Sequence, residues 1–429
     1  MQWRYVLWGG ALAGTVAAYW LVRPLKVAVL MGVDGGVTRE PQAKLCTMAF
    51  LFPVLHLYNT GVSSLSLSRL VAVVAAAQIA IFSALALVLV PAAATGSLAA
   101  AYAAYALIES VGSLTVTMMW SCISCGIHAE KALVVYPRLT VTQQLGALAA
   151  SYAASCLADA YQSPSVLVAA GGAAAIAGTA SALAALAASP ASLAAENLDE
   201  LRASDTASET SEEDGRAHAR AAAAAAAGAG KRNPGALELL ATYGSFIAHM
   251  TIISCASDVL MAASAAYETP AAMAAFVASV GTVINVATLA VSLAGPGPIV
   301  RAVGLRTALL AFPLVAMAVV WAVALASSPV LALAFAVVVL KTCKYALNTP
   351  AKELIYVQAR PEVKLAVKPW IDAVGGRSAK GFGSLANTAL LAIAPSGVQL
   401  HWLSSAACSA VAVVWAWSAA HVHSWSAGA

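Results

Sequence analysis

Long runs of apolar residues, separated by short charged or turn-forming segments, recur along the whole chain. A helix that crosses the hydrocarbon core of a bilayer needs about 20 such residues. Twelve segments approach this length: 5–23, 44–62, 69–92, 97–125, 138–160, 165–188, 237–262, 270–294, 303–326, 329–348, 378–396 and 398–418. Lipid, and not water, must therefore be the solvent for most of the chain.

The composition excludes a soluble enzyme. Of the 429 residues, 61% are hydrophobic and 10% are charged, whereas soluble domains have about 25% charged residues. A β-barrel would show short alternating segments, but here the runs are long, unbroken and rich in Ala and Leu. We predict an all-α membrane protein with twelve transmembrane helices. Because no A-x-A-like cleavage site follows Trp20, we expect the first run to be a retained helix.

One long polar stretch, residues 190–235, divides the chain evenly. It holds eight acidic and five basic residues and separates six expected spans from six others. Such a polar segment is typical of a solvated linker. The predicted domains are an N-terminal six-helix half (1–189), a linker (190–235) and a C-terminal six-helix half (236–429), an arrangement used by secondary transporters that bind substrate between two halves.

Basic residues are distributed unequally between the two sides of the expected bundle. With an even number of spans both termini lie on one side, and 19 Lys and Arg fall there. The opposite side carries only Arg23, Lys26, Arg39 and Lys44. Since basic loops are retained in the cytosol, both termini are predicted to be cytosolic or in the equivalent compartment of an organelle. The sequence leaves open which membrane holds the protein.

Two acidic residues lie inside apolar runs, where a charge costs about 2.5 to 3.5 kcal/mol. Glu109 is near the middle of the fourth run and Asp258 is in the seventh. They are either structural charges that pair with polar groups of a neighbouring helix or functional groups. As functional groups, they would carry protons, orient a cation or position substrate-binding bases.

Two basic segments are candidates for binding an anion. The stretch 341–380 holds eight bases and three acids, and Gly375-Gly376 precedes Arg377 and Lys380 at an expected helix start. A cytosolic basic loop is also explained by topology and lipid headgroups. However, Arg23, Lys26 and Lys44 lie on the side where bases should be scarce. A polyanionic solute is the simplest reason to retain them.

The chain lacks a P-loop, so we expect transport without nucleotide hydrolysis. The seven cysteines lie in apolar stretches, and Cys122 and Cys125 have neither a second pair nor a flanking His. We predict no metal, no cofactor and no enzymatic activity.

Three segments resemble one known family, the non-mitochondrial ATP/ADP translocases of plastids and intracellular bacteria. KYALNTPAKELIY (344–356) with KPWIDAVGGR (368–377) is similar to the family patterns KYSLFDPxKEMAYIPL and KGKAAIDVVGxxLGKS. Glu109-Ser-Val-Gly-Ser through Tyr136-Pro137 resembles AELWGS…FW…FYPLFG. Arg23-Pro-Leu-Lys26 and Pro41-Gln-Ala-Lys44 resemble LRxxKD and PFLK, with Val27 in place of the acid.

The resemblance implies a major facilitator-like fold and nucleotide exchange. Family knowledge implies two essential lysines and two essential acids, which fall on Lys44, Glu109, Asp258 and Lys368. The remaining residues that we expect around the substrate are the charged members of the same motifs. These are Arg23, Lys26, Lys344, Lys352, Glu353, Asp372, Arg377 and Lys380.

The sequence supports a first hypothesis and leaves two others open. The first is an ATP/ADP antiporter, with phosphate as a further co-substrate, that acts as a monomer in the bilayer and binds no nucleic acid. The second is a proton-coupled symporter of nucleotides or another organic anion, in which Glu109 or Asp258 takes up a proton. The third is a membrane scaffold that recruits partners through residues 190–235.

Overall fold

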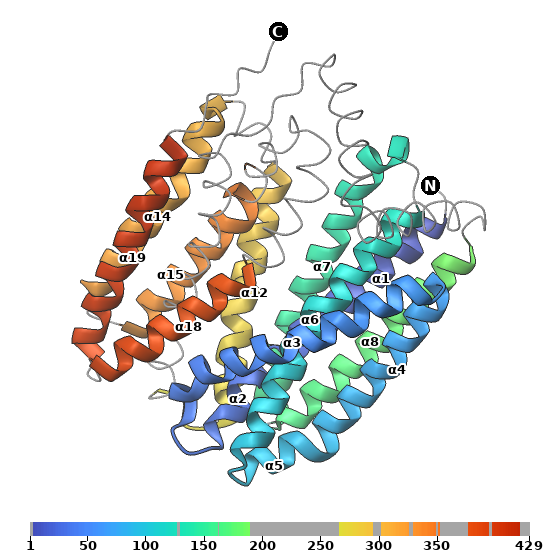
Figure 1. Cartoon of the computed structure of the whole chain (residues 1–429), viewed down its shortest axis with the longest axis horizontal. Coiled ribbons are helices and arrows are strands. Elements are labelled where there is room, and N and C mark those ends of the chain that lie inside the picture. The colour runs from blue at the N-terminus through green and yellow to red at the C-terminus, as the bar shows by residue number, and fades with distance from the viewer. Residues whose placement is uncertain are drawn as a thin grey trace, which may run out of the picture. The chain divides into compact units, whose positions relative to one another are not determined.

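In the computed structural model the described residues are 3–126, 129–161, 163–188, 266–294, 302–325, 329–348, 351, 376–393 and 397–420, and the elements that they form are helices (Figure 1). This confirms the all-α prediction. The N-terminal elements are α1 (Trp3–Val22), α2 (Leu25–Met31), η1 (Gly36–Arg39), α3 (Glu40–Ser64), α4 (Leu67–Ala84), η2 (Leu85–Leu89), α5 (Val90–Ala94), α6 (Leu98–Gly126), α7 (Ala129–Tyr161) and α8 (Pro164–Ala187). The later elements are α12 (Pro270–Ala294), α14 (Leu305–Ala324), α15 (Pro329–Cys343), η3 (Lys344–Asn348), α18 (Gly376–Ile393) and α19 (Gly397–Ala420).

Helices cover the expected membrane spans wherever the chain is described. The run 69–92, for example, corresponds to α4, η2 and α5 in succession, and the run 329–348 to α15 and η3. The expected span 237–262 lies outside the described residues. By length and composition, seven helical segments of the described chain are able to cross a membrane: Trp3–Met31, Leu67–Ala94, Leu98–Trp120, Pro164–Ala187, Pro270–Val291, Leu305–Ala324 and Trp402–Ala420. The total of twelve spans stays a prediction.

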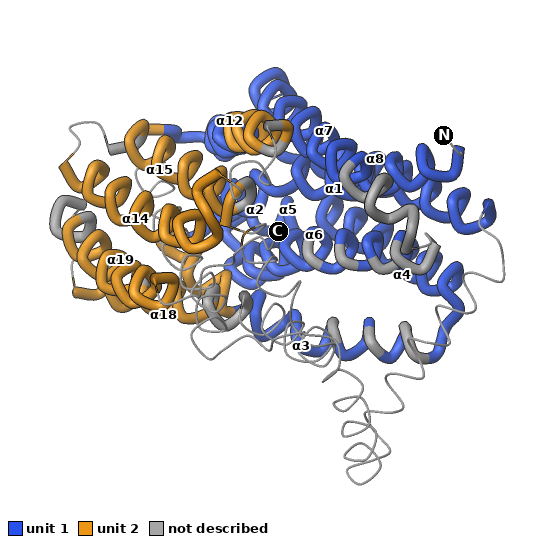
Figure 2. The backbone as a smooth tube through the Cα atoms, turned by 90° about the horizontal axis from the view of Figure 1, so that it is seen from above, with its two compact units in different colours: residues 1–36, 46–224, 267–282 blue, residues 37–45, 225–266, 283–429 orange. Residues whose placement is uncertain are grey.

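The chain forms two compact units, shown in different colours in Figure 2. Unit 1 comprises residues 1–36, 46–224 and 267–282, and unit 2 comprises 37–45, 225–266 and 283–429. The predicted boundaries at 189/190 and 235/236 lie outside the described residues, so the division into two halves and a linker stays a prediction.

Unit 1 is organised around α1, which packs against α6, α7 and α8. Glycines allow the helix backbones to approach closely. A Cβ on Gly14 of α1 would lie 2.7 Å from the backbone of Gly178 on α8, and a Cβ on Gly146 of α7 would lie 2.7 Å from the Ala13 carbonyl oxygen. Helices in lipid associate mainly through such close packing of small residues. The small residues of α1 therefore explain its central place in the unit.

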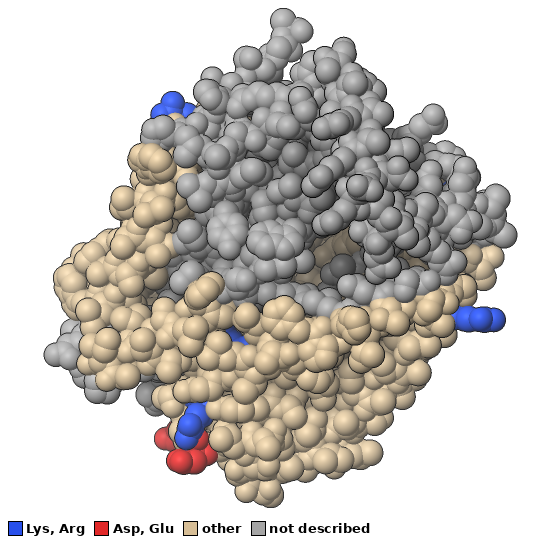
Figure 3. All heavy atoms as spheres, viewed as in Figure 1, with Lys and Arg blue, Asp and Glu red and all other residues tan. Residues whose placement is uncertain are grey.

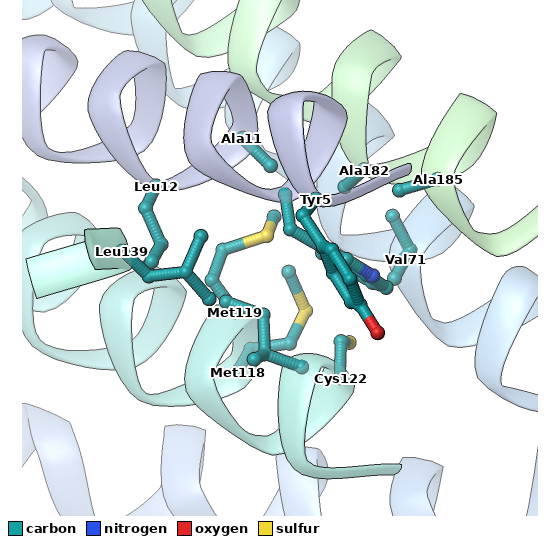
Figure 4. Close-up of a cluster of buried hydrophobic side chains, with 12 residues drawn as sticks. Tyr5, Ala11, Leu12, Val71, Met118, Met119, Cys122, Leu139, Ala182 and Ala185 are labelled. Atoms are coloured by element: carbon teal, nitrogen blue, oxygen red, sulfur yellow. The ribbon is translucent and has the colours of Figure 1, made fainter. Parts of the chain in front are cut away.

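An apolar cluster of unit 1 lies where α1 meets α4, α6, α7 and α8 (Figure 4). Met118, Met119 and Cys122 of α6 pack with Tyr5 and Leu12 of α1. Cys122 is fully buried in this cluster. Cys122 therefore packs as a small apolar side chain, as cysteine usually does in protein cores.

Unit 2 contains a second packed pair, α14 with α19. The rings of Phe312 and Trp415 pack edge to face with centroids 5.0 Å apart. Trp321 Nε1 donates a hydrogen bond to Ser409 Oγ at 2.8 Å. Both contacts join the two helices, and aromatic pairs of this geometry add about 0.5–1.5 kcal/mol beyond their buried area.

Large apolar side chains also point outward from the helices. Leu87 is 78% exposed, Leu57 70% and Phe335 67%. On the face seen in Figure 3, charged side chains of the described residues form only isolated spots on an uncharged surface. Monomeric soluble proteins rarely expose apolar surface of this extent. These side chains are placed to contact lipid.

Candidate functional site

The candidate site in unit 1 begins at the break between α1 and α2. Pro24 has no backbone N–H and stands at the N-cap of α2 with φ −63°. The Arg23 N–H donates to the Tyr19 carbonyl at 2.8 Å, closing the last turn of α1. Proline thus ends one helix and starts the next, which places Lys26 in the first turn of α2.

Lys26 forms an ion pair with Glu109 of α6. Lys26 Nζ lies 3.0 Å from Glu109 Oε2, and each side chain is 13% exposed. The two residues are 83 positions apart in the sequence, and the packing of α2 on α6 brings them together. An unpaired charge inside an apolar bundle costs free energy. Each of these two groups lowers that cost for the other. The structural half of the prediction for Glu109, a pair with a neighbouring helix, is therefore present.

Two tyrosines lie beside this pair. The Tyr19 hydroxyl donates to Glu109 Oε2 at 3.4 Å, and Lys26 Nζ lies 5.1 Å from the centroid of the Tyr105 ring. Tyr105 and Glu109 are four residues apart and share one face of α6. The lysine therefore has a carboxylate on one side and the electron-rich face of a ring on another.

Gly112 continues the same face of α6, three residues after Glu109. A Cβ at this position would lie 2.2 Å from Tyr19 Cδ2. Contacts below 3.0 Å are incompatible with a real Cβ. The absence of a side chain at Gly112 is what lets the Tyr19 ring lie against α6 and reach Glu109.

Arg23 lies beside aromatic rings. Its guanidinium carbon is 4.4 Å from the Trp20 centroid and 5.9 Å from the Tyr19 centroid. Such stacking stabilises a half-buried guanidinium without using all of its donors. A stacked arginine still presents N–H groups to an anion.

Lys44 is held by an acid of its own helix. Its Nζ lies 2.7 Å from Glu40 Oε2, and the exposed fractions of the two side chains are 15% and 4%. The residues are one turn apart at the start of α3. The sequence motifs place Lys44 in the site and leave Glu40 out of it. The sequence does contain a signal for the Glu40–Lys44 pair, because an acid and a base four residues apart on a helix lie close enough to interact.

The remaining predicted residues divide into two groups. Lys344 opens η3, a π-helical turn after α15, and Arg377 and Lys380 lie near the start of α18. Irregular turns of this kind are frequent at functional sites. The others, Asp258, Lys352, Glu353, Lys368 and Asp372, lie outside the described residues. Of the predicted set, the described structure thus joins Lys26 with Glu109, and adds Tyr19, Tyr105 and Gly112.

The described residues contain no group of three or more His, Cys, Asp or Glu side chains arranged to hold a metal ion. The chemistry that the unit 1 site offers is electrostatic. At the end of α1 and the start of α2 it presents Arg23, which stacks on aromatic rings, and Lys26, whose charge is balanced by Glu109.

The fold resembles those of solved transporters over nearly the whole chain. An auto-inhibited POT family peptide transporter has a TM-score of 0.68 and 14% identity, covering 98% of this chain and 97% of its own. A bacterial homologue of the iron transporter ferroportin in an inward-facing state has a TM-score of 0.62 and 13% identity, covering 96% and 98%. The nucleoside transporter NupG has a TM-score of 0.56 and 12% identity, covering 98% of each chain. The search of curated proteins found no match.

These likenesses define the fold, which is all-helical, multi-pass and major facilitator-like. Within this fold, residues 261–424 match the TLC ATP/ADP transporter family. This match includes the motifs at 344–356 and 368–377 and agrees there with the resemblance drawn from the sequence.

Proposed function

We propose that the protein is a secondary active nucleotide transporter that exchanges ATP for ADP, with phosphate as a further co-substrate. The match of residues 261–424 to the TLC ATP/ADP transporter family carries the proposal. The ion pairs in the first part of the chain support it, because their carboxylates stabilise lysine ammonium groups, which are able to bind phosphate, inside an apolar protein.

The physical role of the lysines is to neutralise phosphate. An ammonium group is a compact point charge that binds phosphate oxygens strongly where water is scarce. In the proposed site, Lys26 and Lys44 from the first part of the chain act with Lys368, and with the charged groups of residues 344–380, on the polyphosphate. Glu109 and Asp258 hold the lysines in position when no substrate is bound.

Alternating access follows from the fold class. In major facilitator-like transporters two halves rock around a site near the middle of the membrane. We propose that the halves 1–189 and 236–429 move in this way, with the linker 190–235 in the cytosol beside both termini.

A transport assay separates exchange from the proton-coupled alternative. Vesicles containing the protein are loaded with ADP or left empty, and uptake of labelled ATP is measured with and without a pH gradient. Exchange predicts that uptake requires internal ADP and is insensitive to the gradient. Uptake that ignores internal ADP but follows the gradient would establish symport, with Glu109 as the first candidate for the proton acceptor because it lies in a hydrogen-bonded network with Tyr19.

A further inference from the structure

We propose that Glu40 competes with the substrate phosphate for Lys44, and so sets how readily a bound nucleotide is released. The inference rests on the proposed function, since it takes Lys44 as a phosphate-binding residue. It assigns a role to an acid that no motif of the sequence identified.

The geometry of the pair favours such competition. Glu40 Oε2 and Lys44 Nζ are 2.7 Å apart, a short distance typical of a charge-assisted hydrogen bond. The carboxylate is the more deeply buried partner, with 4% of its side chain exposed against 15% for the lysine. An approaching anion therefore meets the ammonium group first, while the carboxylate behind it holds the lysine in the absence of substrate.

Buried side chains flank Glu40 along the chain. Its neighbours Val37 and Ala43 are buried at 5% and 0% exposure, which anchors the start of α3. A carboxylate in the first turn of a helix is also stabilised by the helix dipole. Glu40 is thus a fixed charge, and the long, flexible side chain of Lys44 is the part that is able to turn toward a ligand.

The pair differs from Lys26–Glu109 in one respect. Lys26 and Glu109 come from two helices, so their distance depends on how α2 lies on α6. Glu40 and Lys44 belong to one turn of one helix and move together. The Glu40 carboxylate therefore stays beside Lys44 in every orientation of the carrier. An exchanger must release nucleotide on both sides of the membrane, and a competitor that travels with the lysine weakens binding on both.

The test is a thermodynamic cycle for ATP binding to the purified full-length chain in lipid nanodiscs. The variants are Glu40→Gln, Lys44→Gln and the double variant, with Asp34→Asn as a control that removes one exposed acid from the neighbouring loop. Glu40→Gln should bind ATP about tenfold more tightly, which corresponds to about 1.4 kcal/mol, and exchange it more slowly. Lys44→Gln should bind more weakly, the double variant should match Lys44→Gln, and the control should match the unmodified chain.

The outcomes distinguish a failure of the role proposed for Glu40 from a failure of the nucleotide site at Lys44. If Glu40→Gln weakens ATP binding or leaves it unchanged while Lys44→Gln weakens it, the role of Glu40 is wrong and the nucleotide site stands. If Glu40→Gln tightens binding even when Lys44 is Gln, Glu40 acts through another group and the inference fails. If Lys44→Gln binds ATP as tightly as the unmodified chain, the phosphate site itself is wrong. Glu40→Asp, which keeps the charge, should retain near-normal affinity. Should Glu40→Gln fail to fold, Glu40→Ala removes the same charge and should also bind ATP more tightly.

Discussion

The position that a Cβ would take on Gly112 lies 2.2 Å from Tyr19 Cδ2, so the ring of one residue occupies the space that the other leaves empty. This contact sets where the Tyr19 hydroxyl can reach, and it reaches Glu109. A glycine on α6 thereby controls the surroundings of the ion pair without touching it.

Gly112→Ala should displace Tyr19 and lower ATP/ADP exchange. Forcing a methyl group into a packed site costs about 1–3 kcal/mol, so the thermal midpoint should fall as well. Adding Tyr19→Ala should restore the midpoint but not the exchange rate, because the hydroxyl next to Glu109 is then gone. Gly172→Ala is the control, since its Cβ would meet Phe82 at an ordinary 3.6 Å. Normal exchange in Gly112→Ala would show that Tyr19 does not position Glu109.

Lys26→Gln should destabilise the protein more than the double change Lys26→Gln with Glu109→Gln. Removing one partner leaves the other charge buried without compensation. We expect a loss of roughly 1–3 kcal/mol for the single variant, less than for a fully buried pair because both side chains keep some exposure to solvent. Thermal unfolding in detergent measures the difference. Equal midpoints for the single and double variants would indicate that the ion pair contributes nothing to stability.

Gly178→Ala should weaken the packing of α8 on α1 without changing the substrate site. Its Cβ would lie 2.7 Å from the backbone nitrogen of Thr15, and backbone atoms cannot move aside as a side chain does. The expected result is a lower unfolding midpoint, with an unchanged apparent KM for ATP in the fraction that remains folded. A raised KM at full stability would mean that the α1–α8 contact takes part in binding.

In vesicles free of phosphate, exchange of ATP for ADP should respond to membrane voltage. The two substrates differ by one phosphate charge, and a charge that crosses the membrane changes in energy by about 2.3 kcal/mol per 100 mV. With ATP inside and ADP outside, an inside-negative potential of 100 mV should shift the equilibrium ratio about fiftyfold toward ATP export. Vesicles with a potassium gradient and valinomycin provide the measurement. A ratio that is independent of voltage would mean that a compensating charge moves with the nucleotide.

The helices were predictable from the sequence because the length and apolarity of each run are local properties that indicate a helix in lipid. The sequence also singled out Glu109, since a charge within such a run is conspicuous. Its partner Lys26 was expected in the site but not as a partner, because a contact between residues 83 positions apart depends on packing that local patterns do not encode.

Tyr19 and Tyr105 were missed because aromatic residues in an apolar helix are usually core. Glu40 was missed because charges in the first loop were interpreted through topology, although its spacing from Lys44 follows the rule for helical ion pairs.

The proposal depends most on a positive charge at positions 44 and 368, and chemical rescue tests that charge directly. In a background in which the seven native cysteines are replaced, Lys44→Cys and Lys368→Cys should each abolish uptake of labelled ATP into ADP-loaded vesicles. Treatment with an aminoethyl thiosulfonate, which restores an ammonium group, should recover uptake, whereas a sulfonatoethyl reagent should not. Full uptake by both untreated variants would contradict a polyphosphate site built from these lysines.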